Sequence, residues 1–513
     1  MTAPSNLLKE YAQRILTARV YDVAIETPLD RMSQLSERLS RNVLLKREDL
    51  QPIFSFKLRG AYNKIVRLPD AQRSLGVICA SAGNHAQGVA LAARKLSIPA
   101  TIVMPRTTPA IKAEAVRRLG GEVVLHGDTF DDAQLKAKEI EVERGLTYVH
   151  PFDDPDVIAG QGTIGLEILR QHPDAIEAIF VPIGGGGLAA GVAAFVKFLK
   201  PSIKVIGVEP ADAASMSAAL GEGHVVALDQ VGLFADGVAV RKAGAETFRI
   251  CRELLDGVVT VDTDAMCAAI KDIFDDVRSI AEPSGALALA GLKVYAQNGA
   301  RSEASLIAVN SGANLNFDRL RTIADRAEVG EHREALLAVT VPEQPGSYRR
   351  FIRILGSRSI TEFNYRFANT NAPAQLFVGI ALSRGEAEKR EVMELLQREG
   401  YPIVDLSENE LAKEHVRYMV GGRAPFLKDE LIYRFEFPER PGALLTFLER
   451  LAPDWNISLF HYRNHGADYG RMLAGIEVKP QERTRFVQAL DSLGYPYWNE
   501  TENPACRLFL SAE

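Results

Sequence analysis

Short apolar runs alternate with longer amphipathic stretches between about residues 43 and 320. Buried strands are predicted at the apolar runs 77–80, 100–104, 122–125, 179–182, 205–208 and 306–309. Segments between them, such as 111–119 and 130–144, repeat apolar residues at the helical period. Because strands and helices alternate in this way, we expect an α/β fold of mostly parallel sheets. Its ligands should bind where loops follow the carboxyl ends of strands.

A different pattern begins after about residue 326, where one segment occurs twice. Four anchors recur in one order, at offsets of 96, 97, 94 and 94 residues: 339–346 and 435–442, 360–366 and 457–463, 400–402 and 494–496, 408–409 and 502–503. Each copy predicts the order strand, helix, strand, strand, helix, strand, the split βαβ arrangement of ferredoxin-like units. We therefore expect a two-lobed block at 1–325, followed by small α+β units at 326–425 and 426–513.

Composition excludes several classes of protein. Of the 513 residues, 47% are apolar and 25% are charged, as is usual for globular proteins. The net charge of −6 predicts no cationic surface for nucleic acid. The four cysteines form no CxxC pair, which argues against a disulfide framework or a zinc cluster. We expect no metal site and a reducing, cytoplasmic location.

The uncharged run at 178–196 has 19 residues, about the length of a membrane span. It contains Pro182 and four consecutive glycines, which would leave the backbone poorly packed in lipid. We therefore interpret it as a buried strand, a glycine loop and a buried helix. The first 14 residues also lack the apolar core of a signal peptide, so we expect no membrane association.

Lys57 is the first candidate for chemistry, because it lies between the apolar residues Phe56 and Leu58. Desolvation lowers the pKa of a lysine and makes its neutral amine available as a nucleophile, as a Schiff-base lysine requires. The alternative is an ordinary lysine that extends its ammonium group to solvent from the start of a helix.

The second candidate is the loop at 81–88, which directly follows a predicted strand. Its small residues let a ligand approach the backbone, and the N–H groups of the following helix favour an anion such as a carboxylate. Asn84 offers donors and an acceptor for orienting a polar substituent. We assign His85 no acid–base role, since a lone histidine is more often a hydrogen-bonded structural residue.

The tetraglycine Gly184–Gly187 follows another predicted strand, and its amides with the next helix N-terminus predict a phosphate cradle. No Walker-type lysine follows, which argues against nucleotide triphosphate hydrolysis. The first and third glycines, with Ala189 and Glu209, also satisfy a relaxed dinucleotide fingerprint. A nicotinamide dehydrogenase is therefore an alternative. Pro210 restricts the space for adenosine over Glu209, but the motif alone does not decide.

Taken together and in order, these motifs resemble the serine/threonine dehydratases, pyridoxal phosphate enzymes of the tryptophan synthase β-like class (fold type II). The resemblance is carried by 46–49 (KRED), 55–61 (SFKLRGA), 81–85 (SAGNH), 184–188 (GGGGL) and 311–312 (SG). The duplicated half resembles the tandem ACT-like regulatory region of biosynthetic members of this family. The resemblance thus extends over nearly the whole chain. It implies two open twisted parallel sheets, followed by two ferredoxin-like ACT-like units.

The resemblance also implies a role for each candidate residue. Lys57 is the catalytic residue that bonds covalently to pyridoxal phosphate, Asn84 meets its phenolic oxygen and Ser311 its pyridine nitrogen. The other cofactor-binding residues are Phe56 and Gly237 at the two ring faces, and Gly184, Gly185, Gly186, Gly187 and Leu188 at the phosphate. The substrate carboxylate is held by Ser81, Ala82, Gly83, Asn84 and His85. Considered by itself, Ser311 equally well begins an ordinary turn.

By the same resemblance, the enzyme deaminates L-threonine to 2-oxobutanoate and ammonia, and L-serine to pyruvate, by α,β-elimination. This is the first step of isoleucine biosynthesis. A homotetramer is expected, inhibited by isoleucine and activated by valine through the C-terminal repeat. The candidate effector residues are Tyr365, Leu444, Leu445, Leu448 and Tyr462.

Besides the nicotinamide dehydrogenase, further alternatives stay open at this point. The repeat could serve only for dimerisation. A serine racemase or a catabolic dehydratase would share the N-terminal motifs, but these relatives lack such a repeat. A non-catalytic amino-acid sensor would need the repeat and not Lys57.

Overall fold

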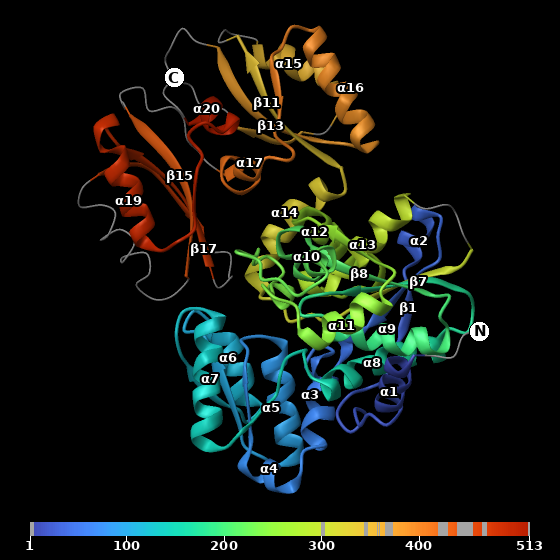
Figure 1. The fold of residues 1–513 in the computed structure, drawn as a ribbon. Coiled ribbons are helices and arrows are strands. Elements are labelled where there is room, and N and C mark those ends of the chain that lie inside the picture. Colours follow the sequence, from blue (N-terminus) through green and yellow to red (C-terminus); the bar gives the residue numbers. More distant parts are fainter. Residues whose placement is uncertain are drawn as a thin grey trace. The chain divides into compact units, whose positions relative to one another are not determined.

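The computed structural model describes residues 5–298, 303–342, 347–356, 358, 360–364, 373–418, 429–438, 455–463 and 469–510. The chain forms two compact units, Met1–Ile323 and Ala324–Glu513. Figure 1 colours them along the sequence, from blue at the N-terminus to red at the C-terminus.

The larger sheet of the first unit has the strand order β1-β2-β10-β7-β8-β9 and is parallel except for β1. Its strands are β1 Leu29–Arg31, β2 Val43–Arg47, β7 Ile176–Pro182, β8 Lys204–Pro210, β9 Gly257–Val261 and β10 Ser305–Asn310. β2 and β10 are buried along their whole length, as central strands covered on both faces must be. The predicted strands at 179–182, 205–208 and 306–309 lie within β7, β8 and β10.

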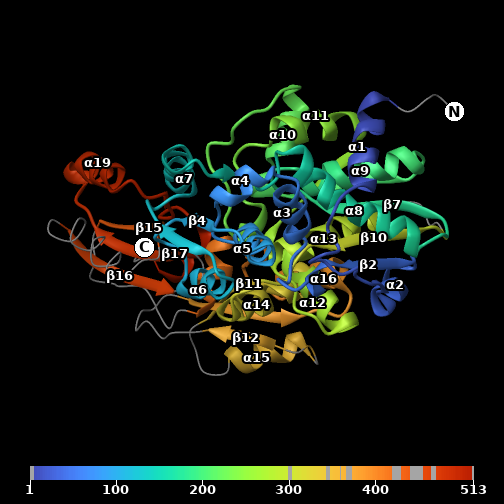
Figure 2. The same cartoon turned by 90° about the horizontal axis from the view of Figure 1, so that it is seen from below.

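The smaller sheet is parallel throughout, with the order β5-β4-β3-β6. Its strands are β3 Val77–Ala80, β4 Ala100–Met104, β5 Glu122–Leu125 and β6 Thr147–Tyr148, and its helices are α5 Asn84–Leu96, α6 Ala110–Arg118 and α7 Phe130–Arg144. Successive residues of β3 face opposite sides: Cys79 packs with α5 and α6, whereas Ile78 packs with α7. Figure 2 shows α7 on one side of β4 and α5 and α6 on the other. The α/β prediction is confirmed for both sheets.

The remaining helices of the first unit are α1 Asn6–Leu16, α2 Ser33–Leu39, α3 Lys57–Val66, α4 Asp70–Leu75, α8 Pro155–Gln171, α9 Gly187–Leu199, α10 Ser215–Glu222, α11 Ala245–Leu254, α12 Thr263–Val277 and α13 Pro283–Asn298. A short 3-10 helix, Asp236–Val238, lies between α10 and α11. Helix α14, Leu320–Gly330, crosses the boundary between the two units.

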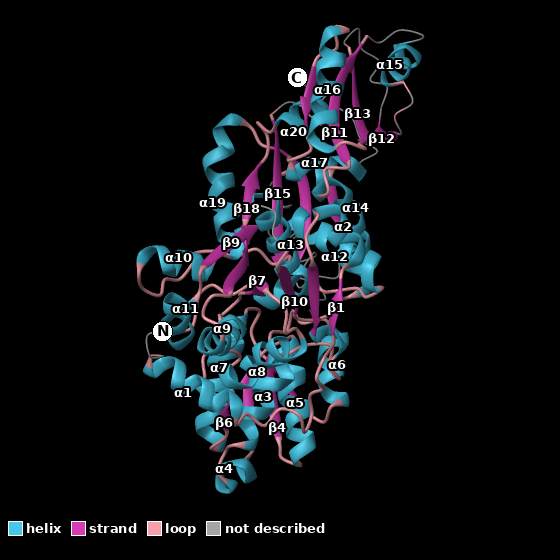
Figure 3. Cartoon of the chain, turned by 90° about the vertical axis from the view of Figure 1, so that its right-hand side faces the viewer, coloured by secondary structure: helices cyan, strands magenta, loops and turns pink. Residues whose placement is uncertain are grey.

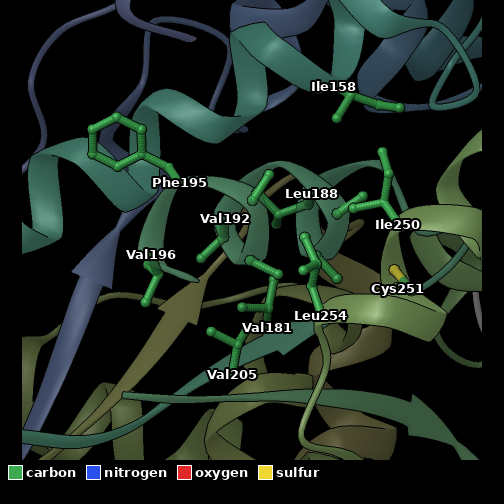
Figure 4. Packing of buried hydrophobic residues seen from close by; sticks show 14 of the residues in the cluster. Ile158, Val181, Leu188, Val192, Phe195, Val196, Val205, Ile250, Cys251 and Leu254 are labelled. Carbon is green, nitrogen blue, oxygen red and sulfur yellow. The ribbon is translucent and has the colours of Figure 1, made fainter. Parts of the chain in front are cut away.

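The uncharged run of the sequence contains part of β7, the glycine loop and most of α9, as predicted. Figure 4 shows Leu188 and Val192 of α9 in one cluster with Val181 of β7 and Ile250 of α11. A Cβ at Gly191 would collide with the backbone of α8, so the two helices pack closely only because this residue is glycine. Within the described part of the chain, no helix is long and apolar enough to cross a membrane.

The second unit contains two antiparallel sheets of one topology, with the orders β12-β13-β11-β14 and β16-β17-β15-β18. The first copy comprises β11 Glu334–Val341, α15 Ser347–Leu355, β12 Ile360–Asn364, β13 Ala374–Ala381, α16 Gly385–Arg398 and β14 Ile403–Asp405. The second comprises β15 Glu430–Pro438, β16 Asn456–Arg463, β17 Tyr469–Glu477, α19 Arg483–Leu493 and β18 Tyr497–Asn499. Figure 3 shows these strands in magenta. The duplication and the ferredoxin-like order are confirmed, although the helix expected after β15 lies outside the described residues.

The two copies share a core. Along β11, Leu337 faces α15 and α16, whereas Leu336 faces a cluster that also contains Ile432 of the second copy. Each copy adds one short helix to this cluster, α17 Glu410–Glu414 and α20 Pro504–Phe509. The duplicated residues Asn409 and Asn503 cap these helices, and Asn409 Nδ2 donates to Asn503 Oδ1 at 3.1 Å. The sequence duplication therefore corresponds to two matching halves packed face to face.

Candidate active site

Lys57 lies at the start of α3 with its amine turned into the protein. Nζ donates to Pro151 O at 2.8 Å and lies 5.3 Å from the centroid of the Phe56 ring. Burial lowers the pKa of Lys57 from 10.5 to about 8, and the negative charge of Glu282 partly opposes this shift. A neutral amine is therefore accessible near neutral pH, which favours the nucleophile over the solvent-extended lysine.

The glycine loop joins the carboxyl end of β7 to the N-terminus of α9. Gly186 has φ +98°, a left-handed conformation that favours glycine, and no side chain among the described residues caps the helix. A Cβ at Gly185 would collide with the Phe152 ring, and one at Gly184 would lie 3.0 Å from Val238 Cα. The first amides of α9 thus stay free of side-chain partners, as an anion cradle requires.

Gln161 of α8 lies beside this loop. Its Oε1 is 2.9 Å from the position of a Cβ at Gly187, and neither polar atom of its amide has a partner in the described chain. Buried amides normally have hydrogen-bond partners, so the surroundings of Gly187 suit a polar ligand or water. Sequence reasoning missed Gln161, because a glutamine within a helical pattern carries no signal of its own.

Asn84 begins α5 and is fixed at both ends of its amide. Nδ2 donates to Glu282 Oε1 at 2.6 Å, and Oδ1 accepts from Asn314 Nδ2 at 2.6 Å. Neither partner was predicted. Asn314 lies three residues after the candidate Ser311, whereas Glu282 reads in the sequence as an ordinary acidic residue before a helix.

Several of the candidate residues lie next to Glu282 or to its hydrogen-bond partner Ser284. Its Oε1 also accepts from Ser284 Oγ at 2.8 Å, and a Cβ at Gly237 would lie 2.5 Å from the same hydroxyl. Ser311 Oγ donates to Ser284 O at 3.1 Å. Burial, and second the charge of Asp236, raises the pKa of Glu282 to about 7. Gly237, Ser311 and Asn84 therefore lie around one buried carboxyl group.

Backbone contacts join Lys57 to this group and to the glycine loop. Phe56 N donates to Ser311 O at 3.2 Å. A Cβ at Gly88 of α5 would lie 3.2 Å from the backbone of Lys57, so the helices that begin with Lys57 and Asn84 touch. On the other side, the Phe152 ring that covers Gly185 follows directly after Pro151, the acceptor of Lys57.

The loop at 81–85 has open space in front of it. A Cβ at Gly83 would meet no atom of the described residues within 4 Å, and none of their side chains caps α5 at this residue. Ser81 Oγ accepts from Gly83 N at 3.3 Å, while Ala82 is partly exposed. His85 Nε2 donates to Val149 O at 2.8 Å, and burial together with the charge of Lys57 lowers its pKa to about 3. The histidine ring is therefore neutral at physiological pH.

Glu209 has a different use from the one that the dinucleotide fingerprint requires. Its two carboxylate oxygens accept from Met216 N and Ser217 N, both at 2.8 Å, at the start of α10. The carboxylate is buried and committed to capping a helix, so it is not presented to a ribose.

Most of the effector candidates lie outside the described residues: Tyr365, Leu444, Leu445 and Leu448. Tyr462 lies in β16, where its backbone pairs with Met472 of β17. In the described part of the chain, no group of histidine, cysteine and carboxylate side chains could hold a metal ion.

Comparison with known families gives two matches that together span most of the chain. Residues 20–312 match the pyridoxal-phosphate dependent enzyme family, and residues 325–416 and 421–510 match the C-terminal regulatory domain of threonine dehydratase.

Similar proteins extend over nearly the whole length. The biosynthetic L-threonine dehydratase of Burkholderia multivorans is 58% identical over 98% of this chain and 99% of its own. That of Escherichia coli strain K12 is 56% identical over 98% and 97%. The chloroplastic biosynthetic threonine dehydratase of Arabidopsis thaliana is 51% identical over 98% and 84%.

Solved structures of related enzymes have the same fold. The processed form of threonine deaminase isoform 2 from Solanum lycopersicum has a TM-score of 0.63 at 53% identity, over 64% of this chain and 90% of that one. Maize serine racemase has a TM-score of 0.57 at 33% identity, over 65% and 100%. The chain belongs to the pyridoxal-phosphate-dependent enzymes, and within them to the biosynthetic threonine dehydratases with a C-terminal regulatory domain.

Proposed function

We propose that this protein deaminates L-threonine to 2-oxobutanoate and ammonia, and L-serine to pyruvate, as the first step of isoleucine biosynthesis. The observation that carries the proposal is the position of Lys57. Its desolvated amine lies between the glycine cradle and the Asn84–Glu282 group, in a chain whose full-length relatives are named threonine dehydratases.

The residues present fit pyridoxal phosphate. The uncapped amides of Gly184 to Gly187 suit its phosphate, and the partnerless amide of Gln161 leaves a hydrogen bond unmade beside them. Asn84 suits the phenolic oxygen. Ser311, directly after β10, would serve the pyridine nitrogen by turning its hydroxyl hydrogen from Ser284 O to that nitrogen. When bound, the group supplies an electron sink for the bond that is broken at Cα.

Lys57 has two tasks in this proposal. Its amine holds the cofactor covalently in the resting enzyme, which requires a neutral nitrogen. With the substrate bound, the same nitrogen would take the Cα proton. A pKa near 8 suits both tasks, because the amine is then neither locked in the charged form nor a weak base.

The substrate is oriented by the loop at 81–85. Its carboxylate would occupy the open space at Gly83 and accept from the free amides at the start of α5. Ser311 is uncharged, so a full positive charge is not held at the pyridine nitrogen. The group would therefore supply a weaker electron sink at this site.

The C-terminal unit would provide control. We assign isoleucine as inhibitor and valine as activator, acting by different affinities for two conformations. The proposal also includes the domain division at 1–325, 326–425 and 426–513, and a homotetramer. It includes a cytoplasmic location as well, which the four buried free cysteines support.

The effector site is tested by titration of isoleucine into the full chain and the Tyr462→Ala variant. Weaker inhibition at unchanged kcat is expected, and equal inhibition would remove Tyr462 from the effector site.

The reaction itself is tested with purified protein and added pyridoxal phosphate. Threonine should yield 2-oxobutanoate and ammonia in equal amounts, and serine should yield pyruvate. Racemised amino acid without oxoacid would contradict the proposal.

A further inference from the structure

We propose that Glu282 and Asn314 are positioning residues that together hold Asn84 with one amide N–H directed at the cofactor's phenolic oxygen. The inference rests on the proposed function and goes beyond it, because it explains which way round the Asn84 amide must lie. Neither residue needs to touch the substrate.

The chain of hydrogen bonds fixes the amide without ambiguity. Asn314 Nδ2 donates to Ile53 O at 2.7 Å, and a backbone carbonyl can only accept. The amide nitrogen of Asn314 therefore faces inward, and its other hydrogen goes to Asn84 at 2.6 Å. The Asn84 atom that receives it must be the oxygen.

The orientation of Asn84 then determines what its nitrogen does. Nδ2 carries two hydrogens, and one of them goes to Glu282 Oε1 at 2.6 Å. The second has no partner that is fixed by this chain of bonds. It is the donor that Asn84 can offer to an anionic oxygen, and a rotated amide would present a repelling oxygen instead.

Glu282 is suited to act as an acceptor in either protonation state. It is 4% exposed, and Oε1 accepts from both Asn84 Nδ2 and Ser284 Oγ. A proton on the other carboxyl oxygen would leave Oε1 an acceptor. The charged groups that act on Glu282 are Asp236, Lys112 and Lys57. An isosteric amide at position 282 should therefore preserve the position of Asn84.

The variants Asn314→Asp and Glu282→Ala test the proposal, with Glu282→Gln as the matched control. Aspartate keeps the shape of Asn314 but only accepts when ionised, so Asn84 should turn its nitrogen away from the cofactor. Glu282→Ala removes the acceptor outright. The readout is the visible spectrum after titration with pyridoxal phosphate. The measured quantity is the absorbance of the long-wavelength band divided by that of the short-wavelength band. The phenolic oxygen is ionised in the species that gives the first band and protonated in the species that gives the second.

The ratio of the two bands should fall about tenfold to hundredfold in Asn314→Asp and Glu282→Ala, the factor that a hydrogen bond to a charged acceptor represents. It should stay within about twofold of the parent in Glu282→Gln. Circular dichroism identifies a misfolded Glu282→Ala, in which case the isosteric Asn314→Asp alone decides.

Unchanged ratios in the variants would overturn the proposal, as would a fall in Glu282→Gln equal to that in Glu282→Ala. If the parent still forms 2-oxobutanoate, only the positioning role fails. A parent that shows no cofactor band at all would overturn the proposed function as well.

Discussion

At Gly185 the backbone has room for a hydrogen atom and for nothing larger, because the Phe152 ring lies against it. Overpacking a well-packed site costs about 1–3 kcal/mol. Gly185→Ala should therefore raise the dissociation constant of pyridoxal phosphate about five- to hundredfold. Titration of the apo-protein followed by cofactor absorbance measures it, and unchanged affinity would show that the loop does not hold the phosphate.

Gly83 provides the opposite case, because in the part of the chain that the structure describes a Cβ there would meet no atom within 4 Å. The added methyl group would occupy the space assigned to the substrate carboxylate. Gly83→Ala should raise the KM for threonine about tenfold, as expected when a charge-assisted hydrogen bond is lost, and leave cofactor affinity unchanged. Steady-state kinetics beside the cofactor titration separate these effects. An equal loss of cofactor affinity would contradict the assignment of this loop to the substrate.

Among the elements, α3 is held by an ion-pair network that is fully buried. Arg59 donates to Glu48 at 2.8 Å and to Glu167 of α8 at 2.6 Å, and all three side chains are 0% exposed. Arg59→Met would leave two carboxylates buried without their main partner, at a cost of about 3–5 kcal/mol. Urea unfolding should show this loss.

The control is Lys136→Met in α7, where the ion pair with Glu139 is exposed. Because solvent screens this pair, the substitution should leave the midpoint of urea unfolding nearly unchanged. Equal stability losses in the two variants would mean that burial of the Arg59 network has no energetic weight.

In the second unit, α17 is joined to α14 by Glu410 and Arg326, at 2.8 Å. Burial raises the pKa of Glu410, but the charges of Arg326 and Lys413 outweigh it and lower the pKa from 4.5 to about 2. A depressed folded-state pKa stabilises the protein above pH 4.5, and this contribution is lost as the pH falls towards 2.

Glu410→Gln should therefore lower the Tm at pH 7 and have no effect near pH 2. Because the Glu410 side chain is 46% exposed, we expect about 1 kcal/mol or less at pH 7. Calorimetry across this range measures the difference, and a Tm gap that widens in acid would contradict the sign.

At the scale of the whole molecule, local patterns predicted the elements and not their partners. The runs at 77–80 and 100–104 coincide with strands β3 and β4, because buried parallel strands are continuously apolar. The run at 122–125 also forms a strand, but its predicted burial is wrong, since β5 lies at the edge of the smaller sheet with Glu122 and Leu125 exposed. The sequence alone does not predict that β10 pairs with β2 and β7. That pairing places Ser311 beside Phe56.

The same distinction holds for the site. Lys57, Asn84 and the glycine loop stand out in the sequence as candidates because each follows a strand or begins a helix with unusual residues. Glu282 was not, since its partner Asn84 is 198 residues away and only the folded chain brings the two together. The duplicated Asn409 and Asn503 were recognisable as a repeat, but their mutual hydrogen bond follows from the packing of the two copies.

The central claim is that Lys57 holds pyridoxal phosphate and takes the Cα proton of threonine. It is tested most directly by the visible spectrum and threonine turnover of Lys57→Ala. Lys64→Ala serves as the control, since Lys64 lies on the same helix and pairs with Asp154 at 2.7 Å. The parent and Lys64→Ala should be yellow and form 2-oxobutanoate, whereas Lys57→Ala should lack the covalent cofactor band and all turnover. A Lys57→Ala protein that retains both would contradict the account.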